Sequence, residues 1–142
     1  TAHLPALSKM RGAEIVALCD NDAAKARGIA QRFGVKNWCT DIDDLLETPD
    51  LDAVIICSPN HAHEVHTLSA LKAGKHVLLE KPIALELYEA DELIAIAKRN
   101  HVKFTIGYSQ RFNTKFAYAK KKLNDGTLGK PVSIMVSRHL SR

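Results

Sequence analysis

The chain has few residues of the kinds that mark secreted, zinc-binding or membrane proteins. It contains three cysteines among 142 residues, and aromatic residues make up only 6%. The odd cysteine number and the lack of C-x-x-C spacing argue against a disulfide framework and favour a reducing, cytoplasmic setting. Cys19 and Cys57 fall in apolar runs, where cysteine packs as a small hydrophobic residue. No apolar run is long enough to span a membrane, so we expect a globular protein with no membrane partner.

A strong excess of charge of one sign is also missing. The formal net charge is +4, and the only dense basic run is Lys120-Lys121-Lys122. Phe112, Phe116, Ala119 and Leu123 recur at helical spacing through this segment, so we interpret the lysines as the solvated face of an amphipathic helix. No aromatic residues interleave with basic ones to form a stacking surface for bases. We therefore expect no nucleic-acid partner.

Strand and helix patterns alternate along the chain. Four apolar runs rich in β-branched residues predict buried strands, at residues 14–19, 53–57, 76–79 and 103–106. Apolar strands separated by amphipathic helices are typical of a parallel sheet covered on both faces. The sequence therefore predicts an α/β fold with a doubly wound, Rossmann-like parallel sheet.

The segments between these strands carry helix signals. Residues 61–73 predict a helix that stops at a left-handed Gly74, and Thr40-x-x-Asp43 predicts a capping box for a short helix that ends before Pro49. Two further helices are predicted by apolar residues at i, i+3, i+4 and i+7. These residues are Ala26, Ile29, Ala30 and Phe33 in the first helix and Leu87, Ala90, Leu93, Ile94 and Ala97 in the second.

The most informative segment is Glu80-Lys81-Pro82-Ile83, which directly follows the apolar run 76–79. An α/β sheet binds its ligands at the carboxyl ends of its strands, and a proline there fixes the backbone that aims the lysine. The alternative is an exposed ion pair between Glu80 and Lys81 followed by a turn, and such pairs contribute little. Both residues are candidates for a ligand site, with the surface pair as the competing interpretation.

Polar residues also follow the other predicted strands. Asp20 stands where a nucleotide-binding domain of this class places an acid for the adenosine ribose hydroxyls, although it could instead cap the next helix, for which Asp22 alone would suffice. Ser58-Pro59-Asn60 precedes a helix N-terminus, a position suited to a pyrophosphate or a ribose, although turns select the same residue types. Residues 107–113 leave the fourth strand with several polar side chains. These strand ends predict one ligand-binding edge.

A cluster of histidines follows the second predicted strand. His63 and His66 are one helical turn apart, and His61 is close in sequence. No carboxylate or thiolate completes a site at a known spacing. We therefore expect no metal.

Each end of the chain carries a pattern that is unusual for a finished enzyme. Residues 1–7 already have a helical pattern, with no strand and no G-x-G-x-x-G loop before them. Residues 132–136 alternate like a strand that leads elsewhere. We therefore expect an internal fragment of a larger protein, whose sheet lacks its first strand.

Several of these motifs, in this order and spacing, resemble the Gfo/Idh/MocA family of glucose-fructose oxidoreductase, inositol dehydrogenase and MocA-like NAD(P)-dependent oxidoreductases. The resemblance implies that residues 1–125 are an N-terminally incomplete dinucleotide-binding domain. It also implies that residues 126–142 begin a truncated C-terminal α+β domain for substrate binding and oligomerisation, with 132–136 as its first strand. The matching segments are residues 3–7, 16–20, 58–60 with His63, 73–77, 80–82, 110–113 and 129–132.

The resemblance also implies roles for individual residues. Asp20 would hold the adenosine ribose, the Ser58-Pro59-Asn60 turn would line the dinucleotide, and Glu80 and Lys81 would lie by the nicotinamide ribose. Lys81 would also reach the reacting hydroxyl of the substrate as the catalytic residue, and the Lys81-Pro82 peptide is often cis in such enzymes. The full set of cofactor-binding candidates is Asp20, Ser58, Pro59, Asn60, His63, Glu80, Lys81, Gln110 and Arg111.

The reaction implied is reversible hydride transfer between a nicotinamide cofactor and a secondary alcohol of a sugar, polyol or related small molecule. Because Asp20 and Asp22 are acidic and no arginine adjoins them, we expect NAD rather than NADP. A buried, cationic Lys81 would polarise the substrate oxygen, while Lys81 itself or a base beyond the chain takes the proton. We expect a homo-oligomer when the protein is intact, and no activity from the fragment. The alternatives are a non-catalytic dinucleotide-binding regulator or scaffold, and an unrelated α/β binding domain.

Overall fold

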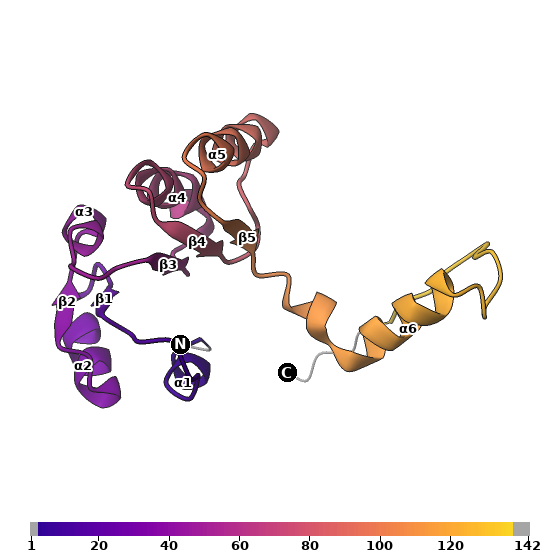
Figure 1. The fold of residues 1–142 in the computed structure, drawn as a ribbon, viewed down its shortest axis with the longest axis horizontal. Coiled ribbons are helices and arrows are strands. Elements are labelled where there is room, and N and C mark those ends of the chain that lie inside the picture. Colours follow the sequence, from indigo (N-terminus) through magenta and orange to yellow (C-terminus); the bar gives the residue numbers. More distant parts are fainter. Residues whose placement is uncertain (1–2, 138–142) are drawn as a thin grey trace. The chain divides into compact units, whose positions relative to one another are not determined.

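The computed structural model describes residues 3–137, which form two compact units (Figure 1). The units divide between Gly107 and Tyr108. The expected domain boundary between residues 125 and 126 stays a prediction. Within residues 3–137, no helix combines the length and the hydropathy that a membrane crossing requires.

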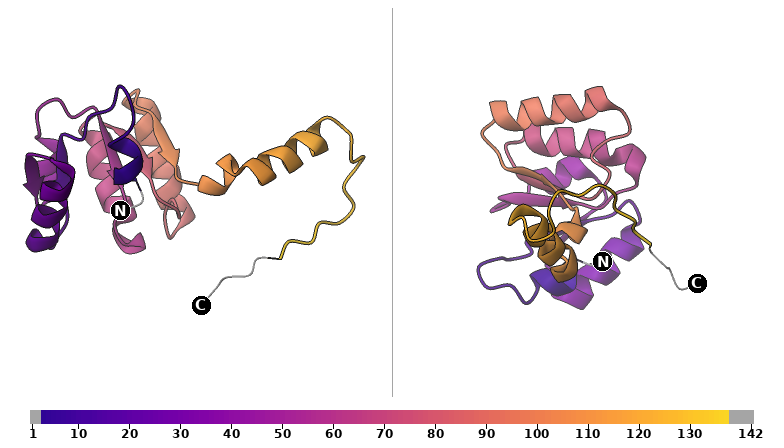
Figure 2. Two further views of the ribbon diagram at one scale, coloured as in Figure 1. Left: turned by 90° about the horizontal axis from the view of Figure 1, so that it is seen from below. Right: turned by 90° about the vertical axis from the view of Figure 1, so that its right-hand side faces the viewer.

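In the described part of the first unit, short parallel strands form two sheets (Figures 1 and 2). One sheet pairs β1 (Ala17–Cys19) with β2 (Asn37–Cys39), and the other has the order β3 (Ala53–Ile56), β4 (His76–Leu79), β5 (Phe104–Ile106). Helices connect the strands, because parallel neighbours need a crossover. The helices are α1 (Leu4–Leu7), α2 (Ala23–Phe33), α3 (Ile42–Leu46), α4 (His63–Lys72) and α5 (Leu87–Arg99), with the 3₁₀ turn η1 (Asn60–Ala62) before α4. The predicted Rossmann-like α/β class is confirmed.

Local capping explains where the longer helices begin and end. Asp22 caps α2 by accepting hydrogen bonds from the backbone N–H groups of Ala24 at 2.9 Å and Lys25 at 3.1 Å. Glu86 and Glu89 form a capping box at the start of α5. The predicted stop of the 61–73 helix is confirmed, because Gly74 has a φ of +73°, which glycine adopts without strain.

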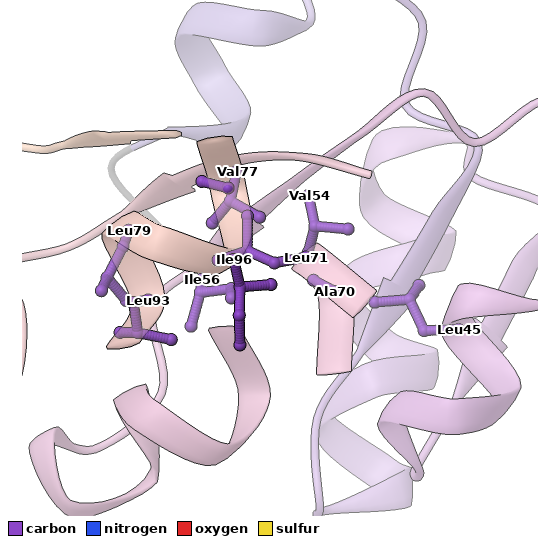
Figure 3. Packing of buried hydrophobic residues seen from close by; sticks show 10 residues of the cluster. Leu45, Val54, Ile56, Ala70, Leu71, Val77, Leu79, Leu93 and Ile96 are labelled. Carbon is purple, nitrogen blue, oxygen red and sulfur yellow. The ribbon is translucent and has the colours of Figure 1, made fainter. Parts of the chain in front are cut away.

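The hydrophobic core lies between the second sheet and its helices. α4 and α5 lie side by side on one face of the β3-β4-β5 sheet (Figures 1 and 2). Leu71 of α4, Leu79 of β4 and Leu93 of α5 are fully buried in one cluster (Figure 3). Burying each such side chain contributes roughly 2 kcal/mol. This packing fixes the strand ends that carry the candidate site.

Several predicted boundaries were wrong, each for a local reason. The strand predicted at 14–19 begins only at Ala17, because only Ala17–Cys19 pairs with β2, a short and partly polar strand that the sequence pattern did not reveal. α3 is capped by Asp41 rather than Thr40, and the Asp41 carboxylate accepts from the N–H of Asp43 at 2.8 Å. The helix predicted at 61–73 starts with a 3₁₀ turn and becomes α-helical at His63.

Some residues expected to be buried are exposed. α5 buries Leu93, Ile96 and Ala97 at i, i+3 and i+4, whereas Leu87 is 86% exposed and Ile94 is 38% exposed. The buried stripe is therefore displaced from the predicted one. Cys19 and Cys57 are also exposed, because one ends β1 and the other follows β3.

The second unit contains the 3₁₀ turn η2 (Ser109–Phe112) and helix α6 (Thr114–Asn124). The helix begins after Asn113 as expected, and the side-chain oxygen of Asn113 accepts from the N–H of Lys115 at 3.0 Å. Phe112 is 85% exposed and Phe116 is 49% exposed, so much of the predicted apolar stripe is uncovered. The strand predicted at 132–136 is wrong, because this segment has no strand partner within residues 108–137.

Candidate functional site

The carboxyl ends of β3, β4 and β5 meet at one edge of the second sheet. Backbone hydrogen bonds continue just beyond the strands, from the N–H of Glu80 to the carbonyl of Ile56 at 2.9 Å and from the N–H of Gly107 to the carbonyl of Leu79 at 2.7 Å. Residues that follow these strands are therefore held in register by the ladder. The edge is a rigid platform for the side chains that come next.

The Glu80 carboxylate lies at the centre of this edge. One oxygen is 2.8 Å from Nε2 of His3, and the other accepts from the backbone N–H of Lys81 at 3.2 Å. A Cβ at Gly107 would lie 3.3 Å from the carboxylate, so the glycine leaves room for it. The hydrogen bond from His3, helped by the Lys81 N–H and opposed by burial, lowers the pKa of Glu80. The Glu80 carboxylate is thus held as an anion at the strand end.

Sequence analysis missed the role of His3. It lies 77 residues from Glu80, and a contact across that distance leaves no local pattern. The role of Gly107 was missed for a similar reason, since its importance depends on a side chain from the neighbouring strand. Only the position of Gly107 directly after β5 could have indicated it.

Lys81 follows Glu80 and precedes a cis peptide bond to Pro82. The cis geometry implied by the family resemblance is confirmed. The expected burial of Lys81 is wrong, because the side chain is exposed at the end of the strand. Among residues 3–137, no ion pair involves its ammonium group, so the surface pair with Glu80 is not formed. The ammonium group is free to meet a ligand.

His63 ties two loops of this edge together. Its ring is buried, with Nδ1 2.7 Å from the carbonyl oxygen of Pro82 and Nε2 2.9 Å from the carbonyl oxygen of Ser58. Both nitrogens therefore face the protein backbone, and neither is directed at a ligand or a metal. In this structure His63 fixes the turn after β3 against the peptide that follows Lys81.

The turn after β3 carries Ser58, Pro59 and Asn60. Pro59 precedes η1, and Asn60 is its first residue. The Ser58 hydroxyl oxygen is buried and has no hydrogen-bond partner in the described part of the chain. A buried hydroxyl without a partner is costly, and a polar group of a bound molecule would satisfy it. The turn therefore fits a polar ligand.

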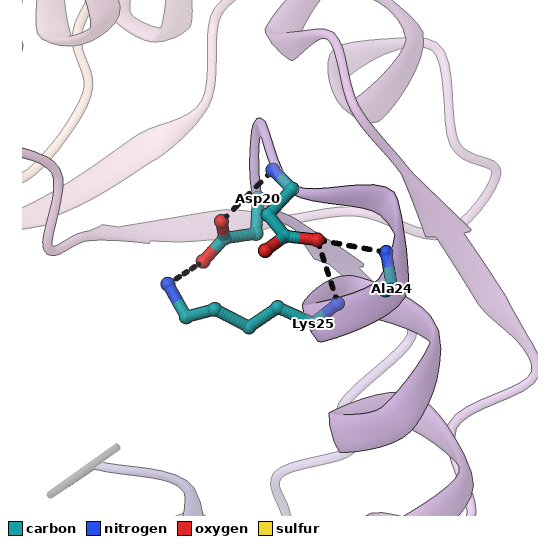
Figure 4. A network of polar contacts seen from close by, with 4 residues as sticks. Asp20, Ala24 and Lys25 are labelled. Atoms are coloured by element: carbon teal, nitrogen blue, oxygen red, sulfur yellow. Dashed lines mark hydrogen bonds and ion pairs between the residues drawn. The ribbon is translucent and has the colours of Figure 1, made fainter.

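Asp20 lies at the end of the other sheet, directly after β1 (Figure 4). One carboxylate oxygen accepts from the backbone N–H of Asp22 at 3.1 Å, and the other forms an ion pair with the Lys25 ammonium group. Burial raises the pKa of Asp20, but the hydrogen bonds from Lys25 and Asp22 outweigh it and leave the pKa lowered. Because Asp22 caps α2, the capping alternative for Asp20 is not observed.

The structure thus brings some of the candidate residues together directly. Ser58, His63, Glu80 and Lys81 share the edge of the β3-β4-β5 sheet through backbone and side-chain contacts. Asp20 ends a strand of the β1-β2 sheet. Gln110 and Arg111 are neighbours in η2 of the second unit, and both are exposed.

Comparison with known proteins identifies the family of the chain. A family model, GFO_IDH_MocA, described as an oxidoreductase family with an NAD-binding Rossmann fold, matches residues 1–108. The chain is similar to myo-inositol 2-dehydrogenase of Thermotoga maritima, with 33% identity over 92% of the chain and 39% of the relative. It is also similar to NAD(+)-dependent scyllo-inositol 2-dehydrogenase of Bacillus subtilis, with 32% identity over 89% of the chain and 37% of the relative.

Solved structures show the same likeness. Scyllo-inositol dehydrogenase from Lactobacillus casei, crystallised with NAD(H) and scyllo-inositol, matches with a TM-score of 0.84 and 32% identity over 89% of the chain and 38% of that protein. The chain spans about two fifths of the length of the curated relatives it matches. The family match, the parallel α/β fold and the arrangement at the strand ends agree, and the chain belongs to the Gfo/Idh/MocA family of oxidoreductases with an NAD-binding Rossmann fold.

Proposed function

We propose that the protein containing this chain is an oxidoreductase that transfers a hydride between NAD and a secondary alcohol of a sugar, polyol or related small molecule. The observation that carries the proposal is the edge of the β3-β4-β5 sheet, where Glu80 and Lys81 follow the same strand. Glu80 is held by hydrogen bonds, and the Lys81 ammonium group forms no ion pair with any of residues 3–137. Ligands of open α/β sheets bind at such edges. Inositol dehydrogenases among the relatives support the alcohol substrate.

The residues present fit a dinucleotide. The unpartnered Ser58 hydroxyl offers a hydrogen bond in the turn before α4, and the Asp20 carboxylate can accept from ribose hydroxyls at the end of β1. Glu80 and Lys81 would stand by the nicotinamide ribose. Pro59 and Asn60 shape the turn, and His63 holds it. The family resemblance implies that Gln110 and Arg111 also bind the cofactor. When bound, the nicotinamide ring accepts or donates the hydride.

Lys81 stabilises negative charge on the reacting oxygen of the substrate. Its ammonium group can donate a hydrogen bond to the substrate hydroxyl and stabilise the negative charge that develops there as a separate base takes the hydroxyl proton. Its compact ammonium on a flexible stem can approach a small oxygen closely, which a planar guanidinium cannot do in the same space. His63 acts through the backbone on either side, because it holds the carbonyl of Pro82 and the carbonyl of Ser58.

The direct test is to incubate the full-length protein with NAD and a panel of inositols and sugars and to monitor the formation of NADH by its absorbance. The account predicts NADH formation with at least one secondary alcohol. The alternative, a regulator or scaffold that binds the dinucleotide without turnover, would give NAD binding and no NADH with any member of the panel. We also propose that the protein is cytoplasmic and forms a homo-oligomer. Sedimentation of the full-length protein would test the oligomeric state, and cell fractionation would test the location.

A further inference from the structure

A cation stands beside the carboxylate that is proposed to hold the adenosine ribose. Lys25 lies in the first turn of α2, and its side chain runs back so that the ammonium group pairs with one oxygen of Asp20 (Figure 4). The Asp20 side chain is 22% exposed, whereas the Lys25 side chain is 56% exposed. The pair is therefore anchored on its acidic side and open to solvent on its basic side.

The charges around this pair decide how a phosphate would be received. An acid at the end of this strand repels a 2′-phosphate on the adenosine ribose, and that repulsion is the usual basis for preferring NAD. Here the Lys25 ammonium offsets the charge of Asp20, while the Asp22 carboxylate is occupied by the N-cap of α2. The hydrogen bond that Lys25 donates to the Asp20 carboxylate raises the pKa of Lys25, so the lysine remains a cation. Repulsion at this site is weaker than the sequence Asp20-Asn21-Asp22 alone indicates.

We propose that Lys25 is a specificity-determining residue, whose ammonium group partly cancels the Asp20 carboxylate and contacts the 2′-phosphate, so that the NAD-preferring site also binds NADP. The inference rests on the proposed dinucleotide site and adds a residue to it. Asp20 is the less exposed member of the pair, and Lys25 is the more exposed one. The Asp20 carboxylate can accept hydrogen bonds from the ribose hydroxyls, whereas the Lys25 ammonium group has no lone pair and cannot accept them, so NAD needs the acid more than the lysine.

The test measures dissociation constants of NAD and NADP by titration of the full-length protein, three variants and one control variant. In Lys25→Gln, NADP affinity should fall about tenfold, because a charge contact with phosphate is lost, while NAD affinity should change less than about threefold. In Asp20→Asn, the ratio of NADP affinity to NAD affinity should rise. Adding Lys25→Gln to Asp20→Asn should abolish that rise. The matched control is Lys72→Gln, which removes the same charge from the last turn of α4.

The outcomes separate this inference from the proposed function. If Lys25→Gln leaves the ratio of NADP affinity to NAD affinity unchanged, Lys25 does not determine specificity. An equal loss of affinity for both cofactors is such a result, and it would make Lys25 only a support for Asp20. If Lys25→Gln and Lys72→Gln lower NADP affinity equally, the effect of Lys25 is only that of surface charge, and the proposal is overturned. Failure of the unmodified protein to bind either cofactor would instead contradict the proposed function.

Discussion

At the scale of single residues, the contact between His3 and Glu80 links stability to pH. The hydrogen bond from His3 lowers the pKa of Glu80 in the folded state. A group with a lowered folded pKa adds stability that is fully present above its ordinary pKa, near 4.5, and that is lost as the pH falls through the folded value. The anion at residue 80 therefore contributes to stability at neutral pH and ceases to do so in acid.

The corresponding prediction concerns Glu80→Gln in the full-length protein. This variant should lose stability at pH 7 but show a smaller further loss than the unmodified protein between pH 5 and pH 3, about the range in which a carboxylate with a lowered pKa is protonated. Urea unfolding at several pH values measures both effects. Parallel pH dependences in the two proteins would show that Glu80 is not responsible. Glu92→Gln, which removes a carboxylate from an exposed position of α5, is a suitable control.

At the scale of elements, His63 decides how two loops are placed against each other. We expect His63→Leu to cost about 2–4 kcal/mol in the free energy of unfolding, because the buried ring bridges the carbonyl groups of Ser58 and Pro82 and a leucine can donate a hydrogen bond to neither. His61→Leu, at an exposed position in η1, should cost no more than about 0.5 kcal/mol. Chemical denaturation of both variants checks this. Similar small losses in the two variants would mean that the link is unimportant.

The same elements show what sequence reasoning could and could not reach. The alternation of apolar runs and amphipathic helices predicted β3, β4 and β5, because each of these strands lies in an apolar run of the sequence. It missed β2, whose three residues pair only because β1 lies beside them. The segment after β4 could be identified as a site, but the contact of Glu80 with His3 and the exposure of Lys81 depend on tertiary placement. Residues that follow a strand can be identified from the local sequence, but the residues that they contact in the fold cannot.

At the scale of the whole molecule, the two sheets of the first unit are separate. Within the described residues, β1 pairs only with β2 and β3 pairs only with β4, so each sheet has an unpaired edge. Unpaired backbone groups at a sheet edge favour association with other chains. The packing of α3 against both β1 and α4 holds the unit together in place of a continuous ladder.

We therefore predict that residues 1–142, expressed alone, are poorly stable or self-associate, and that they have no dehydrogenase activity. Sedimentation measures the self-association of this polypeptide, and denaturant unfolding measures its stability. A monomer that unfolds in one cooperative transition would contradict the importance of the unpaired edges. Addition of NAD should leave the unfolding midpoint nearly unchanged.

The most direct test of the account is Lys81→Ala in the full-length protein, measured as kcat with an active alcohol substrate and as Kd for NAD. Loss of a group positioned at the reacting oxygen should lower kcat by roughly 100-fold or more, with Kd for NAD within about threefold of the unmodified value. Lys81→Arg should not restore turnover, and Lys72→Ala should leave both quantities unchanged. Near-normal turnover in Lys81→Ala would contradict the catalytic role of Lys81 and favour the regulator.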